Sequence, residues 1–269
     1  MTATEGLLRR ERLLVGGCLG LICLLSWYYL LIGAGTGMST LAMTTWQFPP
    51  PVYRSMDAAG WPLTYWLIML LMWWVMMIAM MVPSAAPMIL LYARVYRHNL
   101  PAVSRPSSLV PTGAFLAGYL LAWLCFSLVA TGMQWGLERA GLVHGMMMWS
   151  SNHVLSAGFL LAAGIYQLSP LKSLCLDHCR SPAGFLSEHW RKGRAGALRM
   201  GIDHGLYCVG CCWFLMLLLF VGGAMNLVWI VGLAVLVLLE KLLPGGHRVG
   251  RVSGGLMIIA GALLLLGAW

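Results

Sequence analysis

Long uninterrupted apolar runs constrain the fold of this chain more than any other feature. Several of them approach or exceed about 18 residues, the length that an α-helix needs to cross the apolar core of a bilayer. Hydrophobic residues make up 60% of the chain and charged residues only 9%. Because the backbone inside a bilayer must satisfy its own hydrogen bonds, such runs predict helices. The sequence therefore predicts an all-α polytopic membrane protein.

The apolar runs predict about seven transmembrane helices in a single domain, residues 1–269. The expected spans are residues 13–32, 63–82, 112–132, 153–174, 200–222, 225–243 and 252–269. All of the 17 Lys and Arg residues except Arg54 and Arg139 then fall on one side of the membrane. Positive charge collects in cytoplasmic loops, which predicts a cytoplasmic N-terminus and an extracytoplasmic C-terminus. The net charge of +9 thus reflects the membrane topology. The basic residues form no aromatic-basic module, so the sequence does not predict nucleic-acid binding.

Two connecting segments are long enough to matter for the fold. Residues 33–62 are expected to form an outer loop that contains a run of three prolines, and residues 175–199 a basic cytoplasmic loop that contains cysteines. The second segment is the one inner connection long enough for an amphipathic helix. The first apolar run is too long for the core of a signal peptide and is interpreted as a membrane anchor.

Candidate metal ligands gather at the start of the span predicted at residues 200–222. At 100° per residue, His204, Cys208 and Cys211 lie within about 60° of one another on a helix, with Cys212 beside them. A helix N-terminus favours thiolates, which are the form of cysteine that binds metals. This spacing predicts a face with one imidazole and two or three thiols, a donor set that suits Cu(I) or Zn(II).

A second group of candidate ligands precedes this span. Cys175 and Cys179 are four residues apart, bracket His178, and are expected at the same cytoplasmic face. Cys18, Cys23 and Cys125 are isolated in apolar runs, where cysteine most often behaves as a small hydrophobic residue. The sequence thus predicts one metal site built from two cysteine segments.

Methionines are dense in the second predicted span. Met69, Met72, Met76 and Met80 share one helical face, and Met80 lies at the end expected near the cysteines. Thioethers are soft ligands for Cu(I), so this face predicts a path for the ion with Met80 as a further ligand. Methionine also fills irregular gaps between helices, and packing alone explains the same pattern.

The outer loop between the third and fourth spans has a related composition. His144 and His153 bracket three consecutive methionines and Trp149. This pattern predicts either a copper capture site on the extracytoplasmic face or an interfacial belt anchored by the tryptophan.

Several motifs together resemble a known family. They are Met80-Met-Val-Pro-Ser84 with Pro87, Leu168-Ser-Pro-Leu-Lys-Ser-Leu-Cys175, Cys179-Arg-Ser-Pro182, His204-Gly-Leu-Tyr-Cys208-Val-Gly-Cys-Cys-Trp213 and Gly223-Ala-Met-Asn-Leu227. In these motifs the chain resembles the bacterial predicted metal-binding integral membrane proteins, some of which are labelled copper chaperones. The resemblance implies metal binding by a multi-pass protein of the bacterial inner membrane.

The leading functional hypothesis is a protein that binds Cu(I) and hands it over or translocates it, without an enzymatic step. Its expected partners are the lipid bilayer and a cuproprotein or metallochaperone, in support of cuproenzyme assembly. Zinc is the alternative metal, and a structural-metal or assembly subunit of a membrane complex is an alternative role. Cys208 and Cys211 also have the spacing of a redox motif, so a membrane thiol oxidoreductase is a third interpretation. The sequence contains no nucleotide-binding loop of the G-x-x-x-x-G-K-[ST] type, so ATP-driven pumping by this chain alone is disfavoured.

Overall fold

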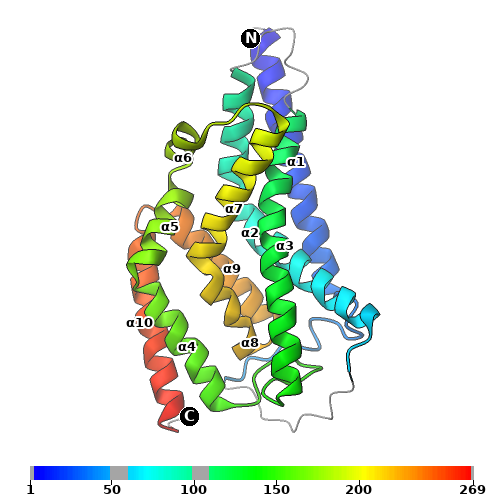
Figure 1. Ribbon diagram of the computed structural model, residues 1–269, viewed down its shortest axis with the longest axis vertical. Helices are drawn as coiled ribbons and strands as arrows, with labels where there is room; N and C mark the ends of the chain where they lie inside the picture. Colours follow the sequence, from blue (N-terminus) through cyan, green and yellow to red (C-terminus); the bar gives the residue numbers. More distant parts are fainter. Residues whose placement is uncertain (1–2, 49–59, 99–108, 268–269) are drawn as a thin grey trace.

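The computed structural model describes residues 3–48, 60–98 and 109–267, and this part of the chain is helical, without strands (Figure 1). Part of the expected outer loop, residues 49–59, therefore lies outside the described residues. The helices are α1 (Ala3–Leu31), α2 (Leu63–His98), α3 (Leu109–Arg139), α4 (His153–Gln167), α5 (Pro170–Arg180), α6 (Pro182–His189), α7 (Gly193–Leu217), α8 (Leu219–Gly222), α9 (Leu227–Leu242) and α10 (Gly246–Leu265). The expectation of an all-α chain is confirmed.

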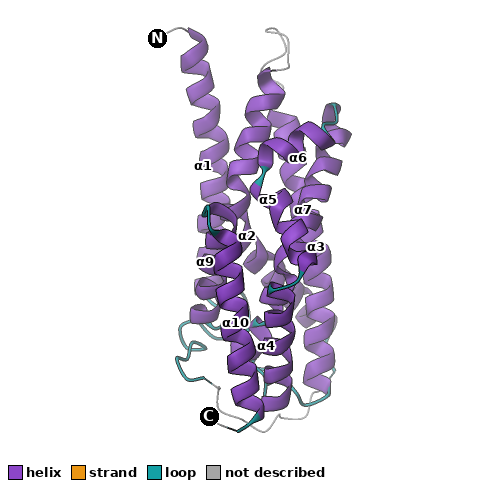
Figure 2. Ribbon diagram, turned by 90° about the vertical axis from the view of Figure 1, so that its left-hand side faces the viewer, coloured by secondary structure: helices purple, strands orange, loops and turns teal. Residues whose placement is uncertain are grey.

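The longer helices run along the long axis of an elongated bundle (Figure 2). The start of α1 and the end of α10 lie at opposite ends of this axis in both views. Contacts are most extensive between α3 and α7, then between α4 and α10, and α7 also contacts α4, α5 and α9. α7 is therefore packed on several sides by other helices.

Within the described residues, five helices are long and apolar enough to cross a membrane, rather than the seven expected: α1 from Leu13, α2, α3, the run Gly193–Gly222 and α10. The fourth expected span is broken into α4 and α5, which meet at an angle of 64° and bring the number to six if they form one span. The sixth expected span, α9, has 16 residues and falls short of the usual length. The long apolar helices are consistent with a membrane protein.

The break between α4 and α5 has a local cause. The side chain of Ser169 caps the new helix by accepting a hydrogen bond from the backbone N–H of Lys172 at 3.2 Å. Pro170 follows at the first helical position, where its missing N–H and fixed φ are favourable. An apolar run that is continuous in sequence is thus interrupted by a capping serine and a proline.

Residues 175–199, expected to form a basic cytoplasmic connection long enough for an amphipathic helix, are largely helical. This segment completes α5, contains the whole of α6 and begins α7. Phe185 and Leu186 of α6 are buried, and α6 contacts α2 and α5. The expected second span is also longer than predicted, because α2 continues through Pro83 and Pro87 as far as His98.

Glycines bring α3 and α7 unusually close together. A Cβ atom added at Gly201 of α7 would lie 2.0 Å from the backbone oxygen of Phe115, and one at Gly118 of α3 would lie 2.1 Å from that of Leu198. Small residues allow helix backbones to approach in this way. The close approach places Tyr119 of α3 directly against the cysteine-bearing face of α7.

Apolar side chains fill the interior and also cover the outside of the bundle. All six methionines between Met69 and Met81 are buried. On the outside, Leu24, Val129 and Ile165 are 70%, 62% and 63% exposed. Large apolar side chains on the outer surface are expected where helices face lipid.

Candidate functional site

α7 carries three cysteines into the interior. Cys208, Cys211 and Cys212 are all buried, with Cys208 fully so. The thiols of Cys211 and Cys212 donate hydrogen bonds to the backbone oxygen of Cys208 at 3.1 and 3.0 Å. The i, i+3, i+4 spacing therefore does place these side chains on one buried helix face.

The thiol of Cys208 has two polar partners from other helices. Nζ of Lys241, in α9, donates to Cys208 Sγ at 2.9 Å. The hydroxyl of Tyr119, in α3, lies 3.1 Å from the same sulfur atom. Lys241 also donates to Ser84 Oγ in α2 at 3.2 Å. Four helices thus converge on one sulfur atom and its ammonium partner.

Two further sulfur atoms come from α5 and α2. The thiol of Cys179 lies close to the thiols of Cys208 and Cys211 and interacts with them. Cys212 Sγ lies 3.9 Å from Sδ of Met81. We call Met81, Cys179, Cys208, Cys211 and Cys212 the sulfur group. The two cysteine segments, distant in sequence, therefore lie side by side in the structure.

Other predicted ligands flank the sulfur group. Cys175 Sγ lies against Gly210, where an added Cβ would be 2.9 Å away. Met80 is buried, but the methionine that contacts a cysteine is its neighbour Met81. His178 stacks on Tyr207 with ring centroids 4.2 Å apart and its Nδ1 is 2.9 Å from the backbone oxygen of Leu174. None of these three side chains bonds to a thiol of the sulfur group in the described part of the chain.

His204 lies one helical turn before Cys208. It is 3% exposed and packs among the rings of Phe115, Tyr119 and Phe185 at centroid distances of 6.1, 5.9 and 5.3 Å. Its Nδ1 atom is buried without a hydrogen-bond partner in the described structure. A buried imidazole nitrogen without a partner is costly, so this atom is open to a ligand.

The sulfur group offers soft donors for a metal ion. Thiolate and thioether sulfur atoms are ligands that favour Cu(I), and the three cysteines of α7 are free and buried. Among the described residues, however, no three His, Cys, Asp or Glu side chains are arranged so that they could already enclose a metal ion. The donors are gathered, but Lys241 and Tyr119 hold hydrogen bonds to Cys208 that a metal would replace or share.

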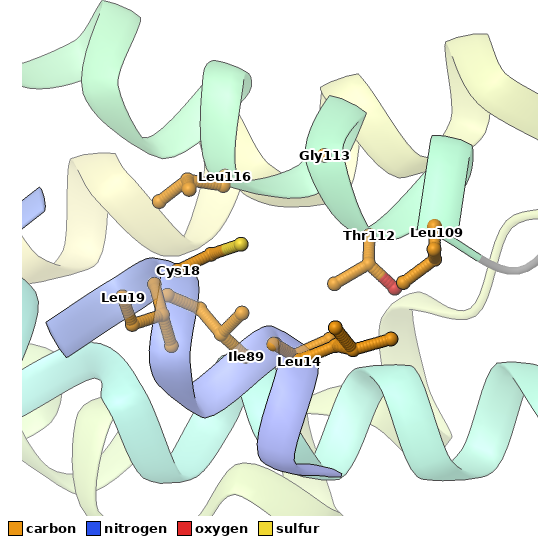
Figure 3. Close-up of a pocket in the computed structure, with 9 residues that line it drawn as sticks. Leu14, Cys18, Leu19, Ile89, Leu109, Thr112, Gly113 and Leu116 are labelled. Carbon is orange, nitrogen blue, oxygen red and sulfur yellow. The ribbon is translucent and has the colours of Figure 1, made fainter. Parts of the chain in front are cut away.

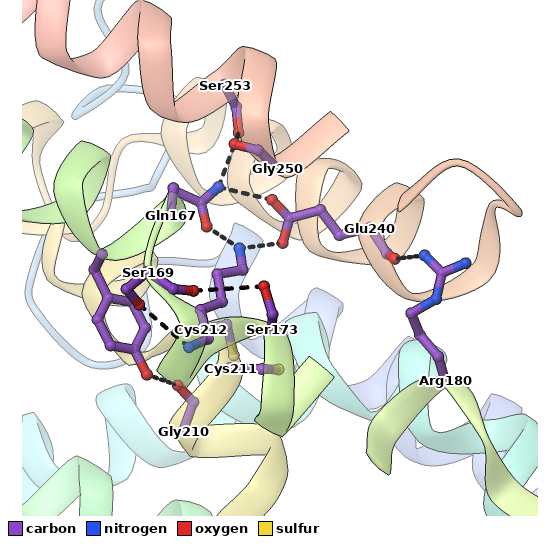
Figure 4. A network of polar contacts seen from close by, with 12 residues as sticks. Gln167, Ser169, Ser173, Arg180, Gly210, Cys211, Cys212, Glu240, Gly250 and Ser253 are labelled. Carbon is purple, nitrogen blue, oxygen red and sulfur yellow. Dashed lines mark hydrogen bonds and ion pairs between the residues drawn. The ribbon is translucent and has the colours of Figure 1, made fainter. Parts of the chain in front are cut away.

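A network of oxygen and nitrogen atoms lies beside the sulfur group (Figure 4). Lys172 of α5 and Glu240 of α9 form an ion pair at 2.6 Å, and both are almost completely buried. Gln167 donates to Glu240 at 2.7 Å and to Ser253 at 2.8 Å, and its own oxygen accepts from Lys172. Arg180 donates to the backbone oxygen of Glu240 at 2.8 Å. The network joins the α4–α5 bend to α9 and α10.

Sequence reasoning missed Tyr119 and Ser84 and treated Lys241 as one of the cytoplasmic positive charges. Lys241 is instead 7% exposed and faces the thiols. One sequence feature could have indicated this: Lys241 follows Glu240 at the end of an apolar run. Two adjacent residues on a helix point about 100° apart, so their charged side chains must have different surroundings. Tyr119 carried no comparable signal, since it lies within an uninterrupted apolar run.

The outer-loop motif and the isolated cysteines lie away from the sulfur group. In the outer-loop motif, Met146 is 61% exposed whereas Met148 is 1% exposed. The methionine side chains of this motif therefore do not point toward one common site. Cys18 lines an apolar cavity of about 280 Å³ between α1, α2 and α3 (Figure 3). The cavity is lined by aliphatic side chains, one threonine and this single thiol, which is not a metal-binding donor set.

Comparison with protein families shows which family this chain belongs to. Residues 70–264 match the model of the family described as PpoB2 copper chaperone, which covers most of the chain. The chain belongs to the PpoB2 copper chaperone family. The matched region contains all five members of the sulfur group together with Tyr119 and Lys241. Neither the curated proteins nor the solved structures provided a match. Family membership supports a copper-handling role and confirms the resemblance to copper chaperones.

Proposed function

We propose that this protein resides in the bacterial inner membrane, binds Cu(I) at the sulfur group and passes the ion to a cuproprotein or metallochaperone. The observation that carries the proposal is the meeting of Cys179 from α5 with Cys208 and Cys211 from α7, beside Met81 from α2. Sulfur donors from three helices converge in a family labelled copper chaperone. The ion is cargo in this proposal, and no enzymatic step is involved.

The contacts of Cys208 suggest how the ion is accepted. Tyr119 and Lys241 hold Cys208 in place before the metal arrives, so little side-chain ordering is needed on binding. Cu(I) tolerates low coordination numbers, and Cys208 with either Cys179 or Cys211 supplies two thiolates. Met81 and the unpartnered Nδ1 of His204 are then further donors near this pair. Weak additional donors of this kind suit an ion that must later leave.

The test is copper binding by the purified protein in detergent, under reducing and oxygen-free conditions. Wild-type protein should retain about one Cu(I) per chain after desalting. The double variant Cys208→Ser/Cys211→Ser should retain almost none, whereas Cys18→Ser/Cys125→Ser, with the same number of thiols removed, should match wild type. Equal copper retention by both double variants would contradict the proposal. Loss of folded protein in the first variant alone would favour a structural-metal or assembly role.

A thiol oxidoreductase is the second candidate, because the Cys179 and Cys208 thiols lie close to each other. Trapping thiols with an alkylating reagent in intact cells distinguishes it from copper transfer. A redox enzyme should show a substantial fraction of chains with Cys208 in a disulfide. A copper carrier should show its cysteines reduced, with alkylation slowed by Cu(I) loading.

A further inference from the structure

Lys241 places a positive charge among thiols rather than beside a carboxylate. Its ammonium group interacts electrostatically with Cys179, Cys208, Cys211 and Cys212. Within the described residues it makes no ion pair with Asp or Glu, because the neighbouring Glu240 points to Lys172. A buried ammonium group without a counter-charge is strongly unfavourable. The nearest partner of Lys241 is therefore a sulfur atom, because Cys208 Sγ accepts its hydrogen bond at 2.9 Å.

This arrangement determines which cation leaves the site uncharged. Two thiolates contribute two negative charges, and Lys241 contributes one positive charge. A monovalent cation bound between the thiolates makes the total zero, whereas a divalent cation leaves one uncompensated positive charge in a low-dielectric interior. Burying such an unpaired charge is strongly unfavourable.

A third thiolate would restore the balance for a divalent ion, but the geometry opposes this. No three His, Cys, Asp or Glu side chains in the described structure are arranged to hold one metal ion together. The thiols of Cys211 and Cys212 are both directed to the backbone oxygen of Cys208. Zinc sites are almost always four-coordinate, whereas Cu(I) is stable with fewer ligands. Charge and ligand number therefore favour the same class of ion.

We propose that Lys241 is a specificity-determining residue, whose fixed charge adapts the sulfur group to monovalent soft cations and discriminates against Zn(II) and other divalent ions. This inference rests on the proposed function, since it assumes that the sulfur group is the copper site. It adds a role for a residue that does not itself ligate the metal. Ser84, which accepts a hydrogen bond from Lys241 at 3.2 Å, keeps the ammonium group at its position.

The experiment compares the affinities for Cu(I) and Zn(II) of wild type, Lys241→Met, Lys241→Gln and Lys241→Arg, by competition with chromophoric chelators in detergent. Removing the charge should weaken Cu(I) binding and strengthen Zn(II) binding, so that the Cu(I)-to-Zn(II) affinity ratio falls about a hundredfold. Lys241→Arg should keep the ratio within about threefold of wild type, because it retains the charge. The control is Arg251→Gln, which removes an exposed positive charge from α10 and should leave the ratio unchanged.

An unchanged ratio in folded Lys241→Met or Lys241→Gln would overturn the inference while leaving the proposed function intact. Failure of wild type to bind Cu(I) would instead remove the proposed function itself. If neither neutral variant folds, the wild-type protein still decides the question with two thiophilic probes of different charge. Ag(I) should displace Cu(I), and Cd(II) at the same concentration should not; displacement by Cd(II) would overturn the inference.

Discussion

The two adjacent charged residues at the end of α9 lie in contrasting surroundings. Glu240 is held by hard partners, the ammonium group of Lys172 at 2.6 Å and the amide of Gln167 at 2.7 Å. Lys241 faces soft partners, with Cys208 Sγ at 2.9 Å, and a single hydroxyl from Ser84. One residue therefore completes an oxygen and nitrogen network, while its neighbour completes a group of sulfur atoms.

The two contacts differ in whether a metal ion could be added without breaking existing bonds. The Lys172–Glu240 pair has its charges matched and its hydrogen bonds filled, so adding an ion there would break existing bonds. The Cys208–Lys241 contact is a hydrogen bond at 2.9 Å, and its sulfur atom has further thiols nearby. We therefore expect the first region to contribute mainly to stability and the second mainly to binding.

The largest expected effect concerns the network. Glu240→Gln leaves the buried Lys172 without a counter-charge, which should lower the free energy of unfolding by about 3–5 kcal/mol. Thermal unfolding in detergent, followed by circular dichroism, measures the change. Glu188→Gln removes an exposed carboxylate from α6 and should have almost no effect. A Glu240→Gln variant as stable as wild type would show that the network is not a stabilising element.

An intermediate effect is expected where α3 and α7 approach each other. Gly201→Ala places a methyl group against the backbone of Phe115, so the helices must separate, at a cost of about 1–3 kcal/mol. Because Tyr119 reaches Cys208 across this contact, copper affinity should also fall. The matched control is Gly132→Ala in α3, where an added Cβ meets nothing within 4 Å. If both variants behaved alike in unfolding and in copper titration, the close approach would not matter.

The smallest effect is expected for Tyr119→Phe. This change removes the hydroxyl that lies 3.1 Å from Cys208 Sγ and should cost about 0.5–1.5 kcal/mol of stability. Tyr28→Phe, at a tyrosine that is 64% exposed, provides the control for the loss of a hydroxyl alone. Chemical denaturation of both variants measures the difference. A loss as large as that for Glu240→Gln would mean that the sulfur group is itself a structural network.

The apolar runs predicted the main helices well, because an 18-residue run in this composition has few alternatives to a helix. They did not predict the break at Ser169 and Pro170, where a cap and a proline interrupt a run that is otherwise apolar. Nor did they predict where the helices within residues 175–199 begin and end, since a short helix such as α6 is stabilised by the burial of Phe185 and Leu186 against other helices.

The site was predictable where it depends on one helix and unpredictable where it depends on packing. Cys208, Cys211 and Cys212 follow from helical spacing alone. The preference for Met81 over Met80 depends on the rotation of α2 against α7, which no spacing rule determines. The direction of Lys241 likewise depends on how α9 packs against α2 and α7. Tertiary arrangement therefore decided the partners of each cysteine.

X-ray absorption spectroscopy at the copper edge, on wild-type protein loaded with Cu(I), tests the central claim most directly. The sulfur group as the copper site predicts about two short copper–sulfur distances that are lost in Cys208→Ser/Cys211→Ser. A first coordination shell of nitrogen and oxygen alone, or a sulfur shell unchanged in that variant, would contradict it.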